Sequence, residues 1–318
     1  MGNQRDSLGD RMKRYEYVSR NYLTRRVPVI IRIDGKAFHT FTKGMRKPFD
    51  RVLMSAMQET MRFLCANIQG CVFGYTQSDE ITLVLTDYAS IRTDAWFGYN
   101  VQKMCSIAAS MATLAFNKAF AEQTEKEDSG IDLTVYRRKF QTAMFDARAF
   151  TVPLDEVCNC LIWRQQDATR NSIEAVGQAN FSQRELHGKN CNKIQDMLWK
   201  ERNINWNDFP TDCKRGSCCI KTRITEAVSV LNGDATVEVS RSRWVVACLY
   251  TRQRVCGATA MTMEEKVQQQ EIMLHELMEK NRESKRELAA YHNIMQGMVG
   301  SANERIDRLE IIVETAIT

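Results

Sequence analysis

The stretch V-I-I-R-I-D-G-K-A-F-H, Val29 to His39, predicts a strand that ends in a carboxylate and a glycine turn. Because side chains alternate between the two faces of a strand, one face of this strand is apolar and the other polar. The apolar face carries Val29, Ile31 and Ile33. The polar face carries Arg32 and Asp34. Gly35 is expected to let the chain turn sharply after Asp34, so that a metal ion or a phosphate can approach the backbone.

A second carboxylate is expected close to the first. The run G-Y-T-Q-S-D-E-I-T-L-V-L, Gly74 to Leu85, predicts two strands broken at residues 77–79, which places Asp79 at a hairpin tip facing Asp34. Two such aspartates suit Mg²⁺, a hard cation bound by carboxylates and substrate phosphates. Two ions about 4 Å apart would hold both oxygens of a phosphoryl transfer. The alternative is that each aspartate only stabilises its turn.

The composition is that of an ordinary globular protein. The chain has 318 residues, 44% hydrophobic and 26% charged, enough for one or two domains. It has no run near the ~20 apolar residues of a membrane span, and its N-terminus lacks a secretory signal, so we expect a cytoplasmic protein without a membrane partner. Most of the 11 cysteines are expected to be free thiols. Their spacing lacks the C-x-x-C pattern, which disfavours zinc.

Charge is unevenly distributed along the chain. Residues 258–318 hold 7 Lys/Arg and 11 Asp/Glu, whereas residues 1–257 hold 37 and 28. A basic body is what a polyanionic ligand requires. Smaller basic clusters are either an RNA track or solvated surface; they lie at residues 136–139, 214–215, 221–223 and 241–243.

The remaining pattern predicts alternating helices and strands. An amphipathic helix over residues 11–26 is expected beside the site. Asp50 is expected to cap a helix whose apolar stripe enters the core. That stripe comprises Leu53, Met57, Met61 and Leu64. Residues 93–120 predict a helix buried almost all round, in which Lys103 needs an anionic partner. Another strand is expected over residues 145–152.

The resulting order of elements is βαββαβ. This is the ferredoxin-like plan of an α+β fold. Nucleic-acid polymerases with a palm domain carry their metal-binding carboxylates on the same plan, which is an analogy of fold and favours nucleotidyl transfer.

Several motifs together resemble the tRNA-His guanylyltransferase family. They are R-I-D-G-K-A-F-H at residues 32–39, K-P-F-D at 47–50, G-Y-T-Q-S-D-E at 74–80, F-D-A-R at 145–148 and W-R-Q-Q-D at 163–167, followed by G-K-N, N-I-N-W and K-R-G-S between residues 188 and 217. The similarity spans about residues 10–245. The segment D-A-T-R-N-S at residues 167–172 resembles the bacterial and archaeal branch of the family more than the eukaryotic one.

The resemblance implies a palm-like enzyme that adds GTP or other NTPs to a tRNA 5′ end in the 3′ to 5′ direction, after activation of a 5′-monophosphate with ATP or directly on a 5′-triphosphate. It implies that Asp34 and Asp79 are catalytic, and that both, with the Gly35 carbonyl, hold two Mg²⁺ ions. It also implies a set of nucleotide-binding residues. These are Arg32, Gly35, Lys36, Ala37, Phe38, His39, Lys47, Ser78 and Lys103, of which Arg32, Lys47 and Lys103 would bind phosphates.

One of these residues and one neighbour need separate consideration. From the residues alone, His39 is either a satisfied core histidine or a nucleotide contact. Glu80, next to Asp79, is expected to point to the other face and is not counted as a ligand.

Family members are commonly tetramers, so self-association of the chain is expected.

Two departures from the family pattern concern substrate choice. Thr169 stands where many relatives carry histidine, and the asparagines of the eukaryotic segment are only partly kept, at Asn171. Asn100 stands where eukaryotic relatives show arginine. Eukaryotic-type recognition of tRNA-His is therefore in doubt, and repair of truncated 5′ ends is expected instead.

The chain is expected to have three parts: a palm-like catalytic domain (1–152), an RNA-side region (153–257) and a helical tail (258–318). In the tail, heptads from Val267 to Ile312 predict either an interrupted coiled coil or one helix lying on its own domain. Two other functions stay open: a palm-domain nucleotide cyclase or dinucleotide synthetase, and a tRNA-binding module without catalysis. The sequence leaves undecided which tRNA is used and whether addition needs a template.

Overall fold

The structure is a computed structural model, and it describes residues 7–128, 130–229 and 236–247, of which residues 223–229 and 236–240 are described by their backbone alone. The chain divides into two units, residues 1–256 and 257–318. The second unit, and with it the predicted heptads, lies outside the described residues. In the described part, no helix is both long and apolar enough to cross a membrane.

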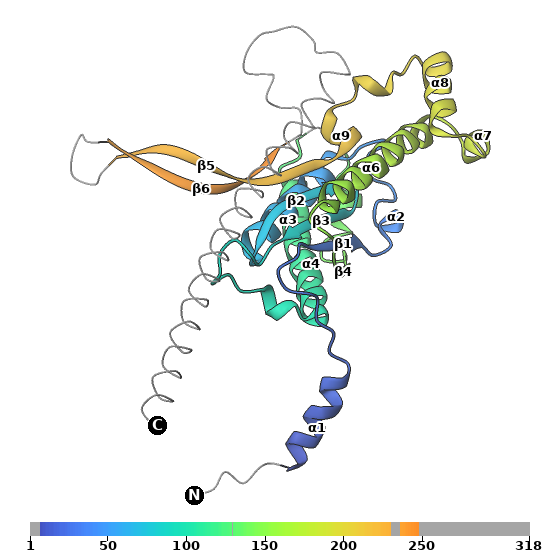
Figure 1. The fold of residues 1–318 in the computed structure, drawn as a ribbon. Helices are drawn as coiled ribbons and strands as arrows, with labels where there is room; N and C mark the ends of the chain where they lie inside the picture. The colour runs from blue at the N-terminus through green and yellow to red at the C-terminus, as the bar shows by residue number, and fades with distance from the viewer. Residues whose placement is uncertain (1–6, 129, 230–235, 248–318) are drawn as a thin grey trace, which may run out of the picture. The chain divides into compact units, whose positions relative to one another are not determined.

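One antiparallel sheet of six strands forms the centre of the first unit (Figure 1). The strands are β1 (Val29–Gly35), β2 (Cys71–Gln77), β3 (Glu80–Leu85), β4 (Phe145–Thr151), β5 (Ser217–Ser229) and β6 (Thr236–Ala247). Their order across the sheet is β4-β1-β3-β2-β5-β6. The chain therefore has the mixed architecture of helices and antiparallel sheet that the sequence predicted.

Two helices pack on one face of this sheet and complete the predicted βαββαβ order. They are α3 (Arg51–Asn67), between β1 and β2, and α4 (Val101–Glu125), between β3 and β4. The main core lies between these helices and the strand residues that alternation assigned to the apolar face, including Val29, Ile31 and Ile33. Asp50 caps α3 as predicted, because its carboxylate accepts from the Leu53 amide at 2.9 Å. Met57, Met61 and Leu64 of the predicted stripe are buried.

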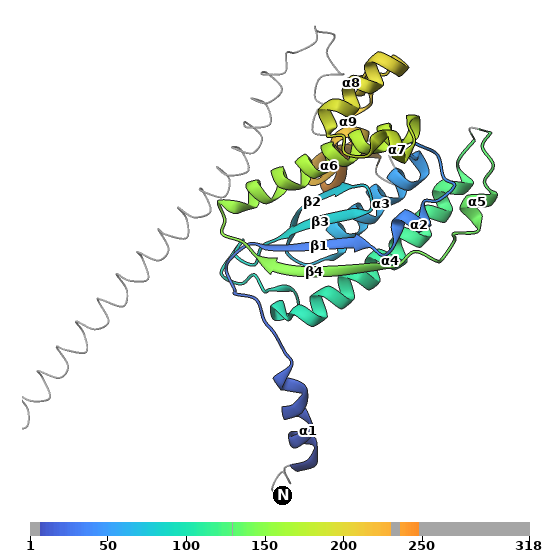
Figure 2. The same cartoon turned by 90° about the vertical axis from the view of Figure 1, so that its right-hand side faces the viewer.

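A third long helix, α6 (Glu156–Asn180), covers part of the opposite face (Figure 2). Its Val157 packs with Ile30 of β1 and Val84 of β3 in a small apolar cluster. Ile30 thus shares this face with the polar residues Arg32 and Asp34, which are two and four positions further along β1. The polar face of β1 is therefore partly covered by α6.

Beyond α6, the chain returns to the sheet through short helices. They are α7 (Gln183–Leu186), α8 (Cys191–Arg202), the 3₁₀ turn η2 (Trp206–Asp208) and α9 (Thr211–Arg215). Their apolar residues form a separate small core with the end of α6. Trp206 anchors it, with its indole N–H donating to the Ser172 hydroxyl at 3.1 Å. β5 then pairs with β2, so the region predicted as the RNA side extends the sheet of the predicted catalytic domain.

Two helix predictions were wrong. The N-terminal helix α1 runs only from Ser7 to Val18 and has no buried residue, so it does not pack beside the site as predicted. The second wrong prediction is the helix over residues 93–120, which was expected to be buried almost all round. It begins only at Val101, after a 3₁₀ turn η1 (Trp96–Tyr99), and only one side of it is buried. Small residues such as Ala108 and Ala112 face the core, and the apolar residues on the remaining sides made the pattern look uniformly buried. The two remaining helices, α2 (Phe38–Phe41) and α5 (Thr134–Arg137), are single turns.

Candidate active site

The end of β1 and the tip of the β2–β3 hairpin are joined by a backbone hydrogen bond. The Gly35 amide donates to the Asp79 carbonyl at 3.1 Å, and the Cα atom of Asp34 lies opposite that of Glu80 in the neighbouring strand. Ser78 and Asp79 form the two-residue tip between β2 and β3, as predicted. The structure therefore brings Asp34 and Asp79 into one site from positions 45 residues apart in the sequence.

The electrostatic surroundings of Asp79 favour its neutral form. Burial raises the pKa of this carboxyl, and the negative charge of Asp34 raises it further. The Ser78 hydroxyl opposes these effects, since it donates to Asp79 Oδ1 at 2.9 Å, and so does the positive charge of His39. A cation placed between the two aspartates would relieve this conflict.

The donors present here suit magnesium. Asp34 and Asp79 offer carboxylate oxygens, and Gly35 offers a backbone carbonyl. In the described part of the chain, no group of three or more His, Cys, Asp or Glu side chains is arranged to hold a metal by itself. A site with two carboxylates leaves positions for water and substrate phosphates, which is how Mg²⁺ is usually bound at nucleotide sites. The assignment of the metal ligands stays a prediction.

Gly35 is required by close packing. A Cβ atom at Gly35 would lie 2.3 Å from the ring of Phe38. The φ angle of Gly35 itself lies outside the left-handed region. The left-handed residue of this turn is Ala37, with φ 55°. The sequence-based explanation of Gly35 by backbone freedom was therefore wrong, and its absent side chain makes room for Phe38. That ring is buried and packs against Phe116 and Phe145, so it anchors the turn in the core.

A pocket opens beside Asp79. Its volume is about 380 Å³, which is within the range of small-molecule sites. It is lined by Gly35, Ala37, Phe38, His39, Thr42, Leu53, Ser78 and Asp79. His39 is exposed, so the alternative of a buried core histidine is wrong. Five of the predicted nucleotide-binding residues thus share one pocket with Asp79.

The predicted basic residues differ in how they lie relative to the aspartates and the pocket. Arg32 lies two residues before Asp34 on the same face of β1, and its Nε is 4.0 Å from a Glu80 oxygen. Lys36 and Lys47 are exposed, and neither belongs to the residues that line the pocket.

Lys103 lies at the opposite end of the sheet from the aspartates. Thr113 of α4 accepts from the Phe145 amide, which is opposite Gly35, and Lys103 is about 15 Å further back along the helix. Lys103 is also exposed, so the premise that burial forces a phosphate partner on it was wrong.

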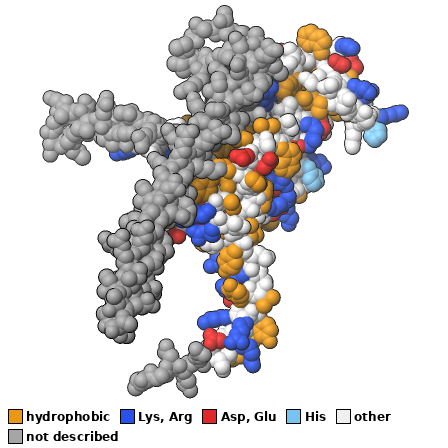
Figure 3. Space-filling model, viewed as in Figure 1, with side chains coloured by type: hydrophobic (Ala, Val, Ile, Leu, Met, Phe, Trp, Pro, Cys, Tyr) orange, Lys and Arg blue, Asp and Glu red, His pale blue; other side chains and the backbone are white. Residues whose placement is uncertain are grey.

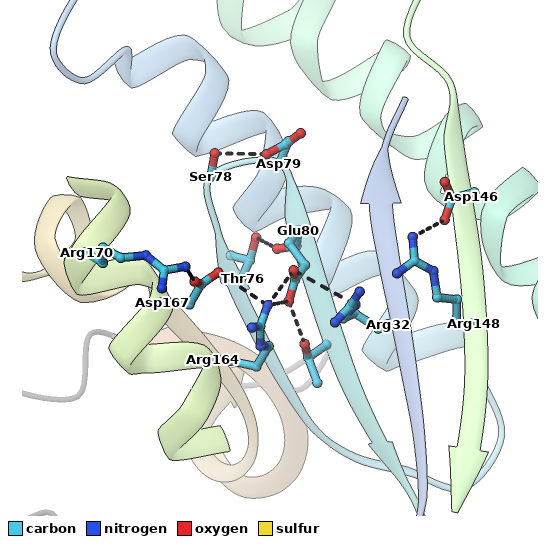
Figure 4. A network of polar contacts seen from close by, with 11 residues as sticks. Arg32, Thr76, Ser78, Asp79, Glu80, Asp146, Arg148, Arg164, Asp167 and Arg170 are labelled. Atoms are coloured by element: carbon cyan, nitrogen blue, oxygen red, sulfur yellow. Dashed lines mark hydrogen bonds and ion pairs between the residues drawn. The ribbon is translucent and has the colours of Figure 1, made fainter. Parts of the chain in front are cut away.

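A buried ion-pair network beside the site was not predicted (Figure 4). Arg164 of α6 binds both carboxylate oxygens of Glu80, at 3.0 and 2.8 Å, and lies 3.5 Å from Asp167. Burial raises the pKa of Glu80, whereas Arg164 opposes the rise. Glu80 is therefore held by arginine, which agrees with its omission from the ligand set. The predicted reason for that omission was wrong, because Glu80 pairs directly with Asp34 and so lies on the same polar face of the sheet. Its arginine partner lies 84 residues away, and no local sequence pattern indicates such a pair.

Comparisons with known proteins identify the family. The pattern of the tRNAHis guanylyltransferase family matches residues 9–153. A solved structure described as a bacterial tRNA(His) guanylyltransferase-like protein in complex with ATP is 45% identical to this chain. The match covers 76% of this chain and 91% of that chain, with a TM-score of 0.63. The chain belongs to the tRNA(His) guanylyltransferase family.

Two further relatives place the chain within this family. A bacterial guanylyltransferase-like protein solved in complex with GTP is also 45% identical, with the same coverage and a TM-score of 0.58. A probable tRNA(His) guanylyltransferase of Dictyostelium discoideum is 26% identical over 73% of this chain and 90% of its own length. The higher identity to the bacterial proteins confirms the predicted resemblance to that branch. The named guanylyltransferases of the family are nucleotidyltransferases.

Proposed function

We propose that this chain adds GTP or other NTPs to the 5′ end of a tRNA in the 3′ to 5′ direction, by two-Mg²⁺ phosphoryl transfer on a palm-like domain. The observation that carries the proposal is the pairing of Asp34 with Asp79 beside the Gly35–Ser78 pocket in a member of this family. The strand order β4-β1-β3-β2 puts both aspartates at one end of the sheet, which is the arrangement expected of a palm.

The residues of the site have distinct roles in this proposal. Asp34, Asp79 and the Gly35 carbonyl would hold Mg²⁺, which when bound would neutralise phosphate charge and activate the attacking 3′-hydroxyl. Ser78 fixes the Asp79 carboxylate through its 2.9 Å hydrogen bond. His39 faces the pocket and would contact the nucleotide. Arg32 stands beside Asp34 and would neutralise phosphate oxygens during transfer.

Three substrates are implied: tRNA, ATP and the added NTP. The solved bacterial relatives were described in complex with ATP and with GTP, which supports nucleotide binding by this chain. A basic surface supports the tRNA partner, because phosphate neutralisation supplies sequence-independent affinity. Blue Lys and Arg side chains recur on α1 and along the right-hand edge of the body in Figure 3. A homo-oligomer, with a tetramer as the first expectation, is part of the same proposal.

The preferred substrate is proposed to be a tRNA lacking its first 5′ nucleotide. Thr169 donates its hydroxyl to the Gln165 carbonyl of its own helix at 3.0 Å, so that proton is already used. Asn100 caps α4, accepting from the Lys103 amide at 3.0 Å. Neither residue therefore offers the stacking or cationic group of the eukaryotic pattern, which favours filling a gap by base pairing over adding G to an intact tRNA-His.

The test is nucleotide addition to two 5′-labelled tRNAs, one truncated by its first nucleotide and one intact tRNA-His, with each NTP and Mg²⁺. We expect a higher kcat/KM on the truncated tRNA, with incorporation following the opposite 3′ strand. Asp34→Asn is the matched inactive control. No addition to either RNA would contradict the proposed function, and formation of a cyclic or dinucleotide product would favour a cyclase instead. A preference for intact tRNA-His that is lost when its anticodon is changed would contradict the repair assignment alone.

A further inference from the structure

Trp163 is a large aromatic side chain on the open surface next to the candidate active site. It precedes the buried Arg164 on α6, yet 49% of its own surface is exposed. A single exposed apolar residue is common and needs no explanation by itself. Trp163 differs because its ring is held in place and because of what it stands beside.

The indole ring is held by the ion-pair network. The Arg164 guanidinium carbon lies 3.6 Å from the Trp163 ring centroid, and Arg164 is itself fixed by its two bonds to Glu80. Among the described residues the Arg164 Nε has no hydrogen-bond partner, and the guanidinium group lies against the indole ring instead. Trp163 is therefore ordered before any ligand arrives, which reduces the entropic cost of using it as a contact.

The ring stands at the border of a polar strip of the sheet that leads to Asp34. The Arg32 guanidinium carbon lies 5.9 Å from the ring centroid, and Arg32 is two residues before Asp34 on the same face of β1. In β4, Arg148 lies opposite Arg32, and Asp146 lies opposite Asp34. The side chains of Arg148 and Asp146 are 54% and 60% exposed, so α6 leaves this strip open.

The chemistry of this border fits a nucleobase attached to phosphates. A fixed indole offers a flat surface on which any base can stack. The guanidinium groups of Arg32 and Arg148 offer positive charge for the phosphate backbone. The pocket around His39 and Ser78 lies at the hairpin tip, so the strip is a separate surface reaching the same aspartates. The geometry points to Trp163 as the platform on which the terminal base at the 5′ end of the RNA substrate stacks. This inference rests on the proposed function, because it needs an RNA 5′ end at Asp34 and Asp79.

The experiment uses the full chain and a truncated tRNA with 2-aminopurine as its first 5′ nucleotide. Stacking on an aromatic side chain quenches 2-aminopurine fluorescence, and a matched tRNA with the probe in the anticodon loop reports binding elsewhere. Variants are Trp163→Leu, which keeps an apolar cover over Arg164 without an aromatic ring, and Trp163→Phe, which restores a ring. Trp199→Leu is the control, because Trp199 on α8 is 58% exposed and does not belong to this network.

We expect Trp163→Leu to lose the 5′-end quench and to weaken RNA binding by about 5- to 150-fold, the range for one base stacked on an aromatic ring. The KM for the NTP should be unchanged, and Trp163→Phe should recover much of the quench and the affinity. An equal quench in wild type and Trp163→Leu would overturn the inference, and so would a change confined to the KM for the NTP. A fall in melting temperature with unchanged RNA affinity would assign Trp163 a purely structural role. The proposed function fails separately, if the wild-type chain adds no nucleotide to the RNA.

Discussion

Asp79 illustrates how one carboxylate can serve function at a cost to stability. Burial and the neighbouring Asp34 raise its pKa above the ordinary value of 3.8, so the folded metal-free protein binds this proton more tightly than the unfolded chain. The contribution of Asp79 to stability therefore falls as the pH rises from 3.8 through the raised pKa. Above that window the ionised Asp79 is a strained group that a bound cation would relieve.

Asp79→Asn should separate the cost of the ionised carboxylate to stability from its role in metal binding and catalysis. In the absence of metal, the variant should be more stable than wild type at neutral pH and equally stable in acid, because amide nitrogen and oxygen do not ionise. Mg²⁺ should raise the melting temperature of the wild type much more than that of the variant. Nucleotide addition should fall more than about 100-fold, since metals contribute several kcal/mol to such transition states. Near-normal turnover by the variant with Mg²⁺ would contradict the two-metal assignment.

Removing Arg164 alone from the Glu80–Arg164 pair should cost much stability, and removing Glu80 as well should restore most of it. Both side chains are at least nine-tenths buried, so removing Arg164 leaves the buried Glu80 carboxylate with only the more distant Arg32, whose Nε is 4.0 Å away. Arg164→Leu should lower the free energy of unfolding by about 3–5 kcal/mol. The double variant Glu80→Leu/Arg164→Leu should recover most of this loss, because the buried carboxylate that Arg164 neutralises has been removed as well. Chemical denaturation of the single and double variants gives the comparison, and an additive double variant would mean that the two groups are not coupled.

At the scale of an element, β2 depends on one glycine for its contact with α3. A Cβ atom at Gly74 would lie 2.5 Å from the Cys65 sulfur and 3.0 Å from Met61 Cγ. Cys65 and Met61 are both buried in α3, so neither side chain can move out to solvent. This close approach seats the helix on the strand that carries the hairpin tip.

Gly74→Ala should therefore destabilise the protein by about 1–3 kcal/mol, the usual cost of overpacking a core. In a Cys65→Ala background the same change should cost less, because the sulfur that the methyl group meets has gone. The four proteins form a double-mutant cycle, measured by urea unfolding, with an expected coupling of about 0.5–3 kcal/mol. Equal costs in both backgrounds would show that Cys65 does not limit the space above Gly74.

Elements with a local signal were predicted well, and those that depend on distant partners were not. β1, the β2–β3 tip and the Asp50 cap each follow from a few adjacent residues, and all three are present. The start of α4 was missed because Asn100, its actual cap, stands inside an apolar run that looked continuous. β5 was not predicted, because its pairing with β2 joins residues about 140 positions apart.

The same distinction holds for the site. Asp34 and Asp79 each end a recognisable strand, and the alternation in β1 also placed Arg32 correctly beside Asp34. Periodicity could not show that Lys103 lies on the exposed side of α4, because its neighbours are apolar on several sides. The role of Arg164 depends on a contact between α6 and β3, which only the folded chain provides.

At the scale of the whole molecule, the prediction concerns the charge and length of residues 258–318. This segment carries a net negative charge and heptads from Val267 to Ile312, whereas the preceding chain is basic. Its Asn281 occupies an a position, where a single asparagine commonly fixes the register and the number of helices in a coiled coil. The segment lies outside the described residues, so its role stays a prediction from sequence.

Deleting residues 263–318 should lower the number of subunits measured by light scattering. The catalytic body should stay folded by circular dichroism, because its sheet and the buried residues of its three apolar clusters lie within residues 29–247. Nucleotide addition per subunit should persist if the site is complete within one chain. Asn281→Leu in the full chain is the matched test of the heptads, since it should change the oligomer without shortening the protein. An unchanged oligomer after both changes would assign assembly to the body, whereas loss of activity together with assembly would show that a neighbouring subunit completes the site.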